Sequence, residues 1–103
     1  TVQLLSRYPE LTALFCYNDL VAIGCLRACA ELGIRVPDQL AVAGFDDIPL
    51  AALVTPALTT HRVPRYQLGV HAVKALLDQI TGAAEGPGEI LVRPELILRA
   101  SAP

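Results

Sequence analysis

Hydrophobic and polar positions along this chain follow two different spacings. Short, nearly continuous apolar runs suit strands that are buried on both faces, and these runs are 12–16, 40–45, 58–63, 89–92 and 95–99. Longer segments carry apolar residues at helical spacing, and these segments are 19–32, 50–54 and 65–80, together with the last turns of a helix that ends before Pro9. The alternation of strands and helices predicts an α/β fold in which helices flank a mostly parallel sheet.

Glycine and proline mark the ends of the expected helices. Gly33 is placed to end the helix at 19–32 in the left-handed conformation. Pro49 suits a first helical position, and Pro64 opens the longest helix, at 65–80.

Polar side chains follow two of the expected strands where each strand ends. Asn18 and Asp19 come after the first run, and Asp46 and Asp47 come after the second. In an open parallel sheet, ligands bind outside the carboxyl ends of the strands, so these groups are candidates for gripping a small polar molecule. Asn and Asp are also preferred helix N-caps. We expect capping for Asp19 and Asp47, and both interpretations stay open for Asn18 and Asp46.

The apolar content is high for a chain of this length. Its 103 residues are 53% hydrophobic and 17% charged, against about 45–50% and about 25% in typical globular domains. Small domains need more polar surface, not less, and the helix at 19–32 is apolar on nearly all sides. No run reaches the roughly 18 apolar residues of a membrane span. We therefore expect another part of the polypeptide, or another subunit, to cover some of this surface.

The helix at 65–80 supports the same expectation, because Leu68, Val73, Leu76 and Ile80 form an apolar stripe along it. Burying each of them contributes roughly 1.5–3 kcal/mol, and the sum is comparable to the net stability of a domain, about 5–15 kcal/mol. The stripe is expected to pack on the chain's own strands or on a second chain.

Charge and chemistry exclude several functions. The net charge is −2 without a Lys/Arg cluster, so this segment is not expected to bind DNA by itself. Cys16, Cys25 and Cys29 are expected to be reduced, small buried hydrophobes, because no further Cys or His lies near enough in sequence to complete a metal site. No phosphate loop, nucleophile elbow or convincing catalytic set is present, so neither enzyme activity nor a cofactor is expected. His61 and His71 are interpreted as structural or solvated.

Several motifs resemble one family when they are taken together and in order. The segments that carry the resemblance are Leu14-Phe15-Cys16-Tyr17-Asn18-Asp19-Leu20-Val21-Ala22-Ile23-Gly24, Glu31-Leu32-Gly33-Ile34-Arg35-Val36-Pro37, Val42-Ala43-Gly44-Phe45-Asp46-Asp47-Ile48-Pro49, Thr55-Pro56-Ala57-Leu58-Thr59-Thr60 and Arg93-Pro94-Glu95-Leu96-Ile97-Leu98-Arg99-Ala100-Ser101. They resemble the lactose/galactose-repressor (LacI/GalR) family over nearly the whole chain. The resemblance implies the carboxyl-terminal part of a two-lobed, periplasmic-binding-protein-like type I effector domain. On this basis residues 1–62 and 89–103 belong to the carboxyl-terminal lobe, and 63–88 form a crossover helix of the amino-terminal lobe.

The resemblance also implies roles for particular residues. Asn18 and Asp46 match positions that hydrogen-bond an effector. Val63 aligns with a position where Gln often contacts ligand, and its apolar side chain counts against a sugar-like effector. Tyr17 is a candidate stacking face. The dimer interface would use Ile23, Leu26, Arg27 and Val54.

The implied protein is a cytoplasmic, homodimeric transcriptional repressor that binds a sugar-like or nucleoside-like effector. It would bind DNA only through a helix-turn-helix outside this chain. A fragment of a periplasmic solute-binding protein for sugar transport is the alternative. An enzyme of flavodoxin-like topology is a third possibility, opposed by the absence of a catalytic set.

Overall fold

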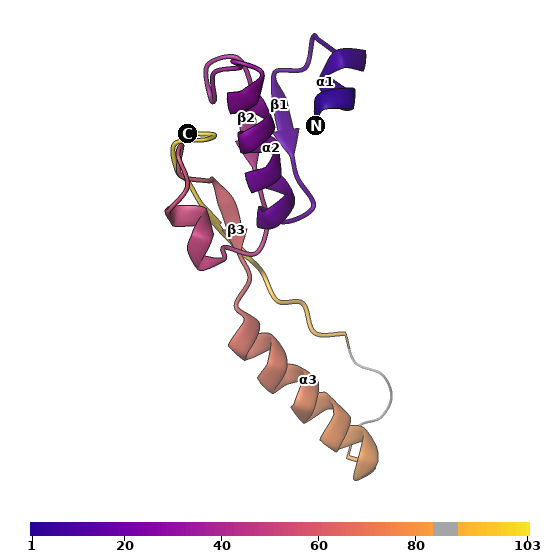
Figure 1. Ribbon diagram of the computed structural model, residues 1–103. Helices are drawn as coiled ribbons and strands as arrows, with labels where there is room; N and C mark the ends of the chain where they lie inside the picture. The colour runs from indigo at the N-terminus through magenta and orange to yellow at the C-terminus, as the bar shows by residue number, and fades with distance from the viewer. Residues whose placement is uncertain (84–88) are drawn as a thin grey trace. The chain divides into compact units, whose positions relative to one another are not determined.

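The computed structural model describes residues 1–83 and 89–103 (Figure 1). Its helices are α1 (Val2–Arg7), α2 (Asp19–Glu31), the 3-10 helix η1 (Pro49–Ala52) and α3 (Arg65–Ile80). Its strands are β1 (Ala13–Phe15), β2 (Ala41–Ala43), β3 (Thr60–Arg62) and β4 (Glu95–Ile97). The described chain divides into two compact units, Thr1–Arg62 with Glu95–Pro103, and Val63–Pro94. The predicted α/β class is confirmed.

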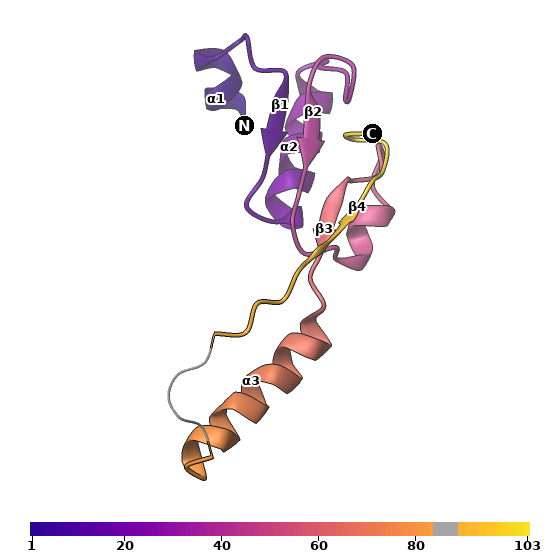
Figure 2. The same ribbon diagram turned by 180° about the vertical axis from the view of Figure 1, so that it is seen from behind.

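The first unit is built around short parallel strands. β1 and β2 pair in parallel, with Phe15 opposite Ala43, and parallel bridges continue the ladder from Ala43 to Thr59 and from Asp46 to Arg62. β4 then pairs antiparallel with β3 (Figure 2). The closing strand is therefore the antiparallel member of an otherwise parallel arrangement.

Helix α2 covers one face of these strands. Asn18 caps it with a hydrogen bond from the Val21 N–H, and Gly33 follows its end with φ of 69°. The buried cluster that joins α2 to the strands comprises Cys16, Ala22, Cys25, Leu26, Cys29, Leu40, Val42, Ala51 and Leu58. The opposite face is not covered to the same extent, since Phe15 is 65% exposed. The expectation that these strands are buried on both faces is therefore wrong for β1 within this chain.

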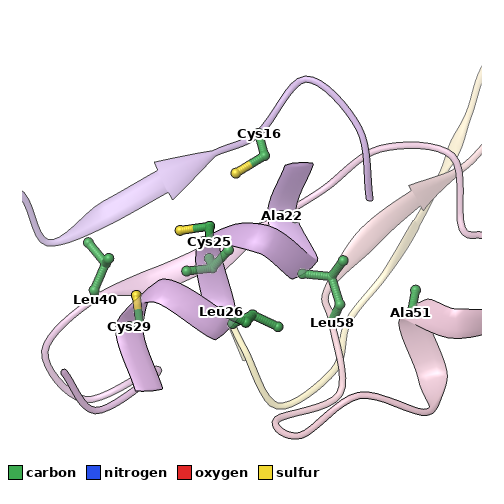
Figure 3. Packing of buried hydrophobic residues seen from close by; sticks show 9 residues of the cluster. Cys16, Ala22, Cys25, Leu26, Cys29, Leu40, Ala51 and Leu58 are labelled. Atoms are coloured by element: carbon green, nitrogen blue, oxygen red, sulfur yellow. The ribbon is translucent and has the colours of Figure 1, made fainter. Parts of the chain in front are cut away.

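The three cysteines lie inside this cluster (Figure 3). The Cys16 side chain points from the end of β1 toward α2, where Cys25 lies. All three thiols are buried and free, which confirms their interpretation as small buried hydrophobes. Burial raises the pKa of the Cys29 thiol to about 11, and contact with Cys25 together with burial raises the pKa of Cys16.

The carboxyl-terminal segment closes the first unit through Ser101. Its hydroxyl donates to Val42 O at 2.6 Å and accepts from Thr59 N at 2.9 Å. Its backbone N–H donates to Ala57 O, and its carbonyl accepts from Val42 N. Ser101 thus connects β2 to the segment that leads into β3.

The second unit contains α3, which begins and ends where the sequence predicts. Leu68, Val73, Leu76 and Ile80 are 46%, 59%, 56% and 71% exposed, so the apolar stripe is uncovered within this chain. The expected strand at 89–92 is wrong, because these residues have no regular structure. Pro94 lacks an N–H for a ladder, and no described strand of this unit is available for pairing. The expected crossover segment 63–88 ends in residues 84–88, which lie outside the described part.

Candidate functional site

The strand register brings Asn18 and Asp46 to the same edge of the parallel ladder. Each lies three residues beyond the last residue of its strand, and those last residues, Phe15 and Ala43, are register partners. Hydrogen bonds from Cys16 N to Ala43 O (2.8 Å) and from Asp19 N to Phe45 O (2.9 Å) hold the two chain segments together beyond the strands. This is the carboxyl edge, where ligands of open α/β sheets bind.

Asn18 combines the two roles that the sequence leaves open. Its Oδ1 accepts from Val21 N at 2.9 Å and caps α2. Within the described residues, no hydrogen bond uses its Nδ2 amide. The side chain is half-buried, so capping fixes its orientation and leaves an amide donor at the edge.

Asp46 adopts an unusual backbone conformation. Its φ is 114°, and that of Asp47 is 51°, in the region that residues other than glycine rarely adopt. The Asp46 N–H donates to His61 O at 2.9 Å. Such conformations persist where the surrounding structure enforces them, and they are frequent at ligand sites.

The expectation that Asp19 and Asp47 act as helix caps is wrong, because Asn18 caps α2 and Ile48 is the N-cap residue of η1. The Asp19 carboxylate is fully buried and accepts from Thr60 Oγ1 and from Ile48 N, the latter at 2.8 Å. The capping residue, Asn18, and the buried acceptor, Asp19, are therefore neighbours in the sequence with different roles.

Asp47 forms ion pairs with two arginines that come from other segments. Its Oδ2 lies 2.7 Å from Arg62 Nε, and its Oδ1 lies 2.7 Å from Arg99 Nη2. Burial raises the pKa of this carboxyl group, but hydrogen bonds from Arg99 and Arg62 outweigh it and hold the pKa below its ordinary value. Asp47 therefore ties β3 and the closing segment to the loop that carries Asp46.

The remaining candidate ligand residues lie in two different units. Tyr17 is 88% exposed and precedes Asn18, so its ring is free of packing within this chain. Val63 is the first residue of the second unit and accepts a hydrogen bond from Arg65 N through its carbonyl.

An aromatic group beside this edge was not predicted from the sequence. The His61 ring stacks on Phe45 at 5.6 Å between centroids and meets Phe15 edge-on at 5.9 Å. Its Nδ1 atom is buried and has no hydrogen-bond partner among the described residues. Only the position of His61 on an expected strand hinted that it is structural.

The candidate dimer residues meet at a second surface. Ile23, Leu26, Arg27 and Val54 line one shallow groove of about 200 Å³, together with Ala30 and Thr55. Leu26 is buried at 6% exposure, whereas the Arg27 side chain is exposed and pairs with Glu31 at 2.9 Å. The groove joins α2 to the residues that follow η1.

The described residues contain neither a candidate metal site nor a candidate membrane-spanning helix. Across 1–83 and 89–103, no group of three or more His, Cys, Asp or Glu side chains is arranged to hold a metal ion. Among the described helices, none has the length and apolar character needed to cross a membrane.

Comparison with known proteins gives one consistent family. The periplasmic binding protein-like domain matches residues 1–102. The HTH-type transcriptional repressor CytR of Escherichia coli is 42% identical over 99 residues, which cover 96% of this chain and 29% of that protein. The chain thus spans less than a third of the length of this relative.

Solved structures agree with the sequence comparison. The transcriptional regulator CelR in complex with cellobiose superposes with a TM-score of 0.90 at 33% identity, covering 96% of this chain and 30% of that one. A LacI family regulator from an Arthrobacter species, in complex with lactose, has a TM-score of 0.82 at 35% identity, covering 98% and 38%. The chain therefore belongs to the periplasmic binding protein-like domain family, in the form that LacI-type transcriptional regulators carry.

Proposed function

We propose that this chain is the carboxyl-terminal part of the effector-binding domain of a transcriptional repressor. The observation that supports this most strongly is the placement of Asn18 and Asp46 at the carboxyl edge of two paired parallel strands, with Asp46 in an enforced left-handed conformation. An effector-binding site for a polar ligand needs hydrogen-bonding side chains at this edge.

The proposed ligand is a small polar molecule with hydroxyl groups. The Asp46 carboxylate accepts hydrogen bonds from hydroxyls, and the Asn18 Nδ2 amide donates to a hydroxyl or carbonyl oxygen. The exposed Tyr17 ring offers a face for stacking on a sugar or a base. Val63 supplies no polar group, so a nucleoside-like effector fits as well as a sugar-like one. CelR and the Arthrobacter regulator are described in complex with cellobiose and with lactose.

The two lobes of the proposed domain account for the uncovered apolar surface. We assign 1–62 and 89–103 to the carboxyl-terminal lobe and 63–88 to a crossover that belongs to the amino-terminal lobe. The stripe of Leu68, Val73, Leu76 and Ile80 on α3 is exposed here, and the rest of that lobe would cover it.

The groove lined by Ile23, Leu26, Arg27 and Val54 is the proposed homodimer interface. Apolar side chains that neighbour the lining residues in sequence are exposed, including Leu20 at 64% and Leu53 at 76%. Exposed apolar patches of this kind are typical of interaction surfaces.

In the proposed mechanism, the effector binds in the cleft between the two lobes and shifts the equilibrium between their open and closed arrangements. Closure changes the spacing of the two DNA-reading headpieces in the dimer. DNA is bound through a helix-turn-helix outside this chain. The chain carries out no chemical reaction and uses no cofactor, and the regulator acts in the cytoplasm.

Sequencing the gene around this chain is the first test. A helix-turn-helix encoded upstream in the same reading frame is the expected result. A secretory signal followed by a first lobe would instead identify a solute-binding protein for transport and would overturn the proposal.

The second test uses the full-length product of this gene and differential scanning fluorimetry. Lactose, cellobiose, cytidine and adenosine serve as probes, and at least one is expected to raise the Tm of the wild type in a concentration-dependent way. Asp46→Asn and Asn18→Ala are expected to reduce that rise at each probe concentration, because both variants weaken binding. The control Asp38→Asn changes an exposed carboxylate that pairs with Arg35 and is expected to keep the full rise. A rise as large as that of the wild type in both site variants would contradict the proposed site.

A further inference from the structure

The buried Asp19 carboxylate belongs to the residue that follows Asn18, and it accepts a hydrogen bond from the end of the loop that carries Asp46. It lies fully inside the first unit. Because Asn18 already caps α2, both Asp19 oxygens are free to bind elsewhere. Their partners belong to the loop that carries Asp46 and to β3.

Two hydrogen bonds join Asp19 to that loop, one at each end of it. Asp19 N donates to Phe45 O at 2.9 Å, immediately before Asp46. Asp19 Oδ2 accepts from Ile48 N at 2.8 Å, immediately after Asp47. The backbone is thus held on each side of the two residues that have positive φ.

Thr60 extends this support to the middle of the loop. Its hydroxyl donates to Asp19 Oδ1 and accepts from Asp47 N at 3.4 Å. Thr60 is itself fully buried, so solvent does not compete for these bonds. The carboxylate, the hydroxyl and the loop amides form one connected network.

The space around Asp19 is closed as well as polar. A Cβ on Gly44 would overlap Asp19 Oδ1 and would lie 3.2 Å from Ala22 Cβ. Neither Asp19 nor Ala22 has access to solvent. Close packing therefore restricts the Asp19 carboxylate to one position. The loop that is hydrogen-bonded to it is held in place in turn.

We propose that Asp19 is a positioning residue for effector binding, which holds the backbone of Asp46 and Asp47 in the left-handed conformation that presents Asp46 at the sheet edge. This rests on the proposed function for its effect on ligand, but the effect on the loop is independent of any ligand. A residue that only stabilises the fold would affect the loop no more than other buried polar residues do.

The test compares four variants of the full-length gene product by amide hydrogen exchange and by binding. Asp19→Ala removes both acceptor oxygens, and Thr60→Val removes the hydroxyl at nearly constant shape. Asp19→Asn is the conservative variant, because its Oδ1 can accept from Ile48 N while its Nδ2 donates to Thr60 Oγ1. Ser101→Ala is the matched control, since it removes two buried hydrogen bonds that lie away from the 46–48 loop.

Asp19→Ala is expected to speed exchange of the 46–48 amides by about ten- to hundredfold beyond the change in Ser101→Ala, as the loss of a hydrogen bond to a charged group implies. Thr60→Val is expected to change it in the same direction, and Asp19→Asn to restore most of the protection. Equal exchange of these amides in Asp19→Ala and Ser101→Ala would overturn the proposal.

Isothermal titration with lactose, cellobiose, cytidine and adenosine gives the effect on ligand. For the probe that the wild type binds, Asp19→Ala is expected to raise the Kd by about tenfold or more. The Kd of Ser101→Ala is expected to be close to that of the wild type. Unchanged affinity in Asp19→Ala would also overturn the positioning role. If the wild type binds none of the four probes, the proposed function loses its support separately, and the exchange measurement still decides the role of Asp19.

Discussion

Gly44→Ala should destabilise this fold through contact alone, without any conformational penalty of its own. The new methyl group would lie 3.1 Å from Leu58 Cδ2 and 3.2 Å from Ala22 Cβ, and it would overlap Asp19 Oδ1. Favourable carbon–carbon contacts need about 3.5–4.0 Å. All three neighbours are fully buried, so none of them can move into solvent to make room.

Two separate costs set the magnitude. Overpacking a well-packed core costs about 1–3 kcal/mol. Displacing the Asp19 oxygen from its bond with Thr60 weakens a hydrogen bond to a charged group, which is worth about 1.5–3 kcal/mol. Together these give a loss of about 2.5–6 kcal/mol, a large part of the 5–15 kcal/mol that a typical domain has.

Urea denaturation of the full-length gene product, followed by circular dichroism, measures this loss as a lower midpoint with an unchanged slope. Gly24→Ala is the matched control, because a Cβ there has nothing within 4 Å and lies in a helix interior. It should leave stability unchanged or raise it by up to about 1 kcal/mol. Gly44→Ala with the stability of the wild type would show that the packing of Asp19, Ala22 and Leu58 around Gly44 is not as described.

Three further predictions concern other parts of the first unit. Ser101→Ala leaves Thr59 N and Val42 O without this hydroxyl, and urea denaturation should show a loss of about 1–3 kcal/mol; a loss below about 0.5 kcal/mol would contradict the closing role of Ser101. The lowered pKa of Asp47 means that its ion pairs stabilise the fold fully above about pH 5 and progressively less as the pH falls below the ordinary value of 3.8. Asp47→Asn should therefore reduce stability at pH 7 and flatten its decline in acid, and a decline as steep as in the wild type would refute the assignment. Ile23→Glu places a charge in the groove beside Val54 and should weaken the proposed dimer in sedimentation velocity, whereas a dimer unchanged at low concentration would rule out this surface.

Local sequence signals predicted the helices well. The bounds of α3 follow from Pro64 before it and the loss of helical spacing after Ile80. The end of α2 follows from Gly33, whose φ of 69° is the left-handed value expected of a terminating glycine. These signals lie within a few residues of the feature that they determine.

Features set by distant partners could not be predicted in this way. Asn18 and Asp19 are both good caps, and the choice between them depends on Thr60, which lies 41 residues further along the chain. The role of Asp47 depends on Arg99, 52 residues away. The strand expected at 89–92 failed for the related reason that an apolar run forms a strand only where a neighbouring strand can pair with it.

The candidate ligand positions were predicted from strand ends and from family resemblance, and the register of β1 and β2 brings Asn18 and Asp46 to one edge. The positive φ of Asp46 and Asp47 has no signal in the sequence, because the bonds that enforce it come from Asp19 and Thr60.

Isothermal titration calorimetry of the full-length gene product tests the central claim, effector binding at this edge, most directly. The titration uses the probe among lactose, cellobiose, cytidine and adenosine that raises the Tm of the wild type. Asp46→Asn keeps the size of the side chain and its tolerance of positive φ but removes the charge, and it should weaken binding by about ten- to hundredfold. Asp38→Asn should bind as the wild type does. Equal affinity of Asp46→Asn and the wild type would contradict the account.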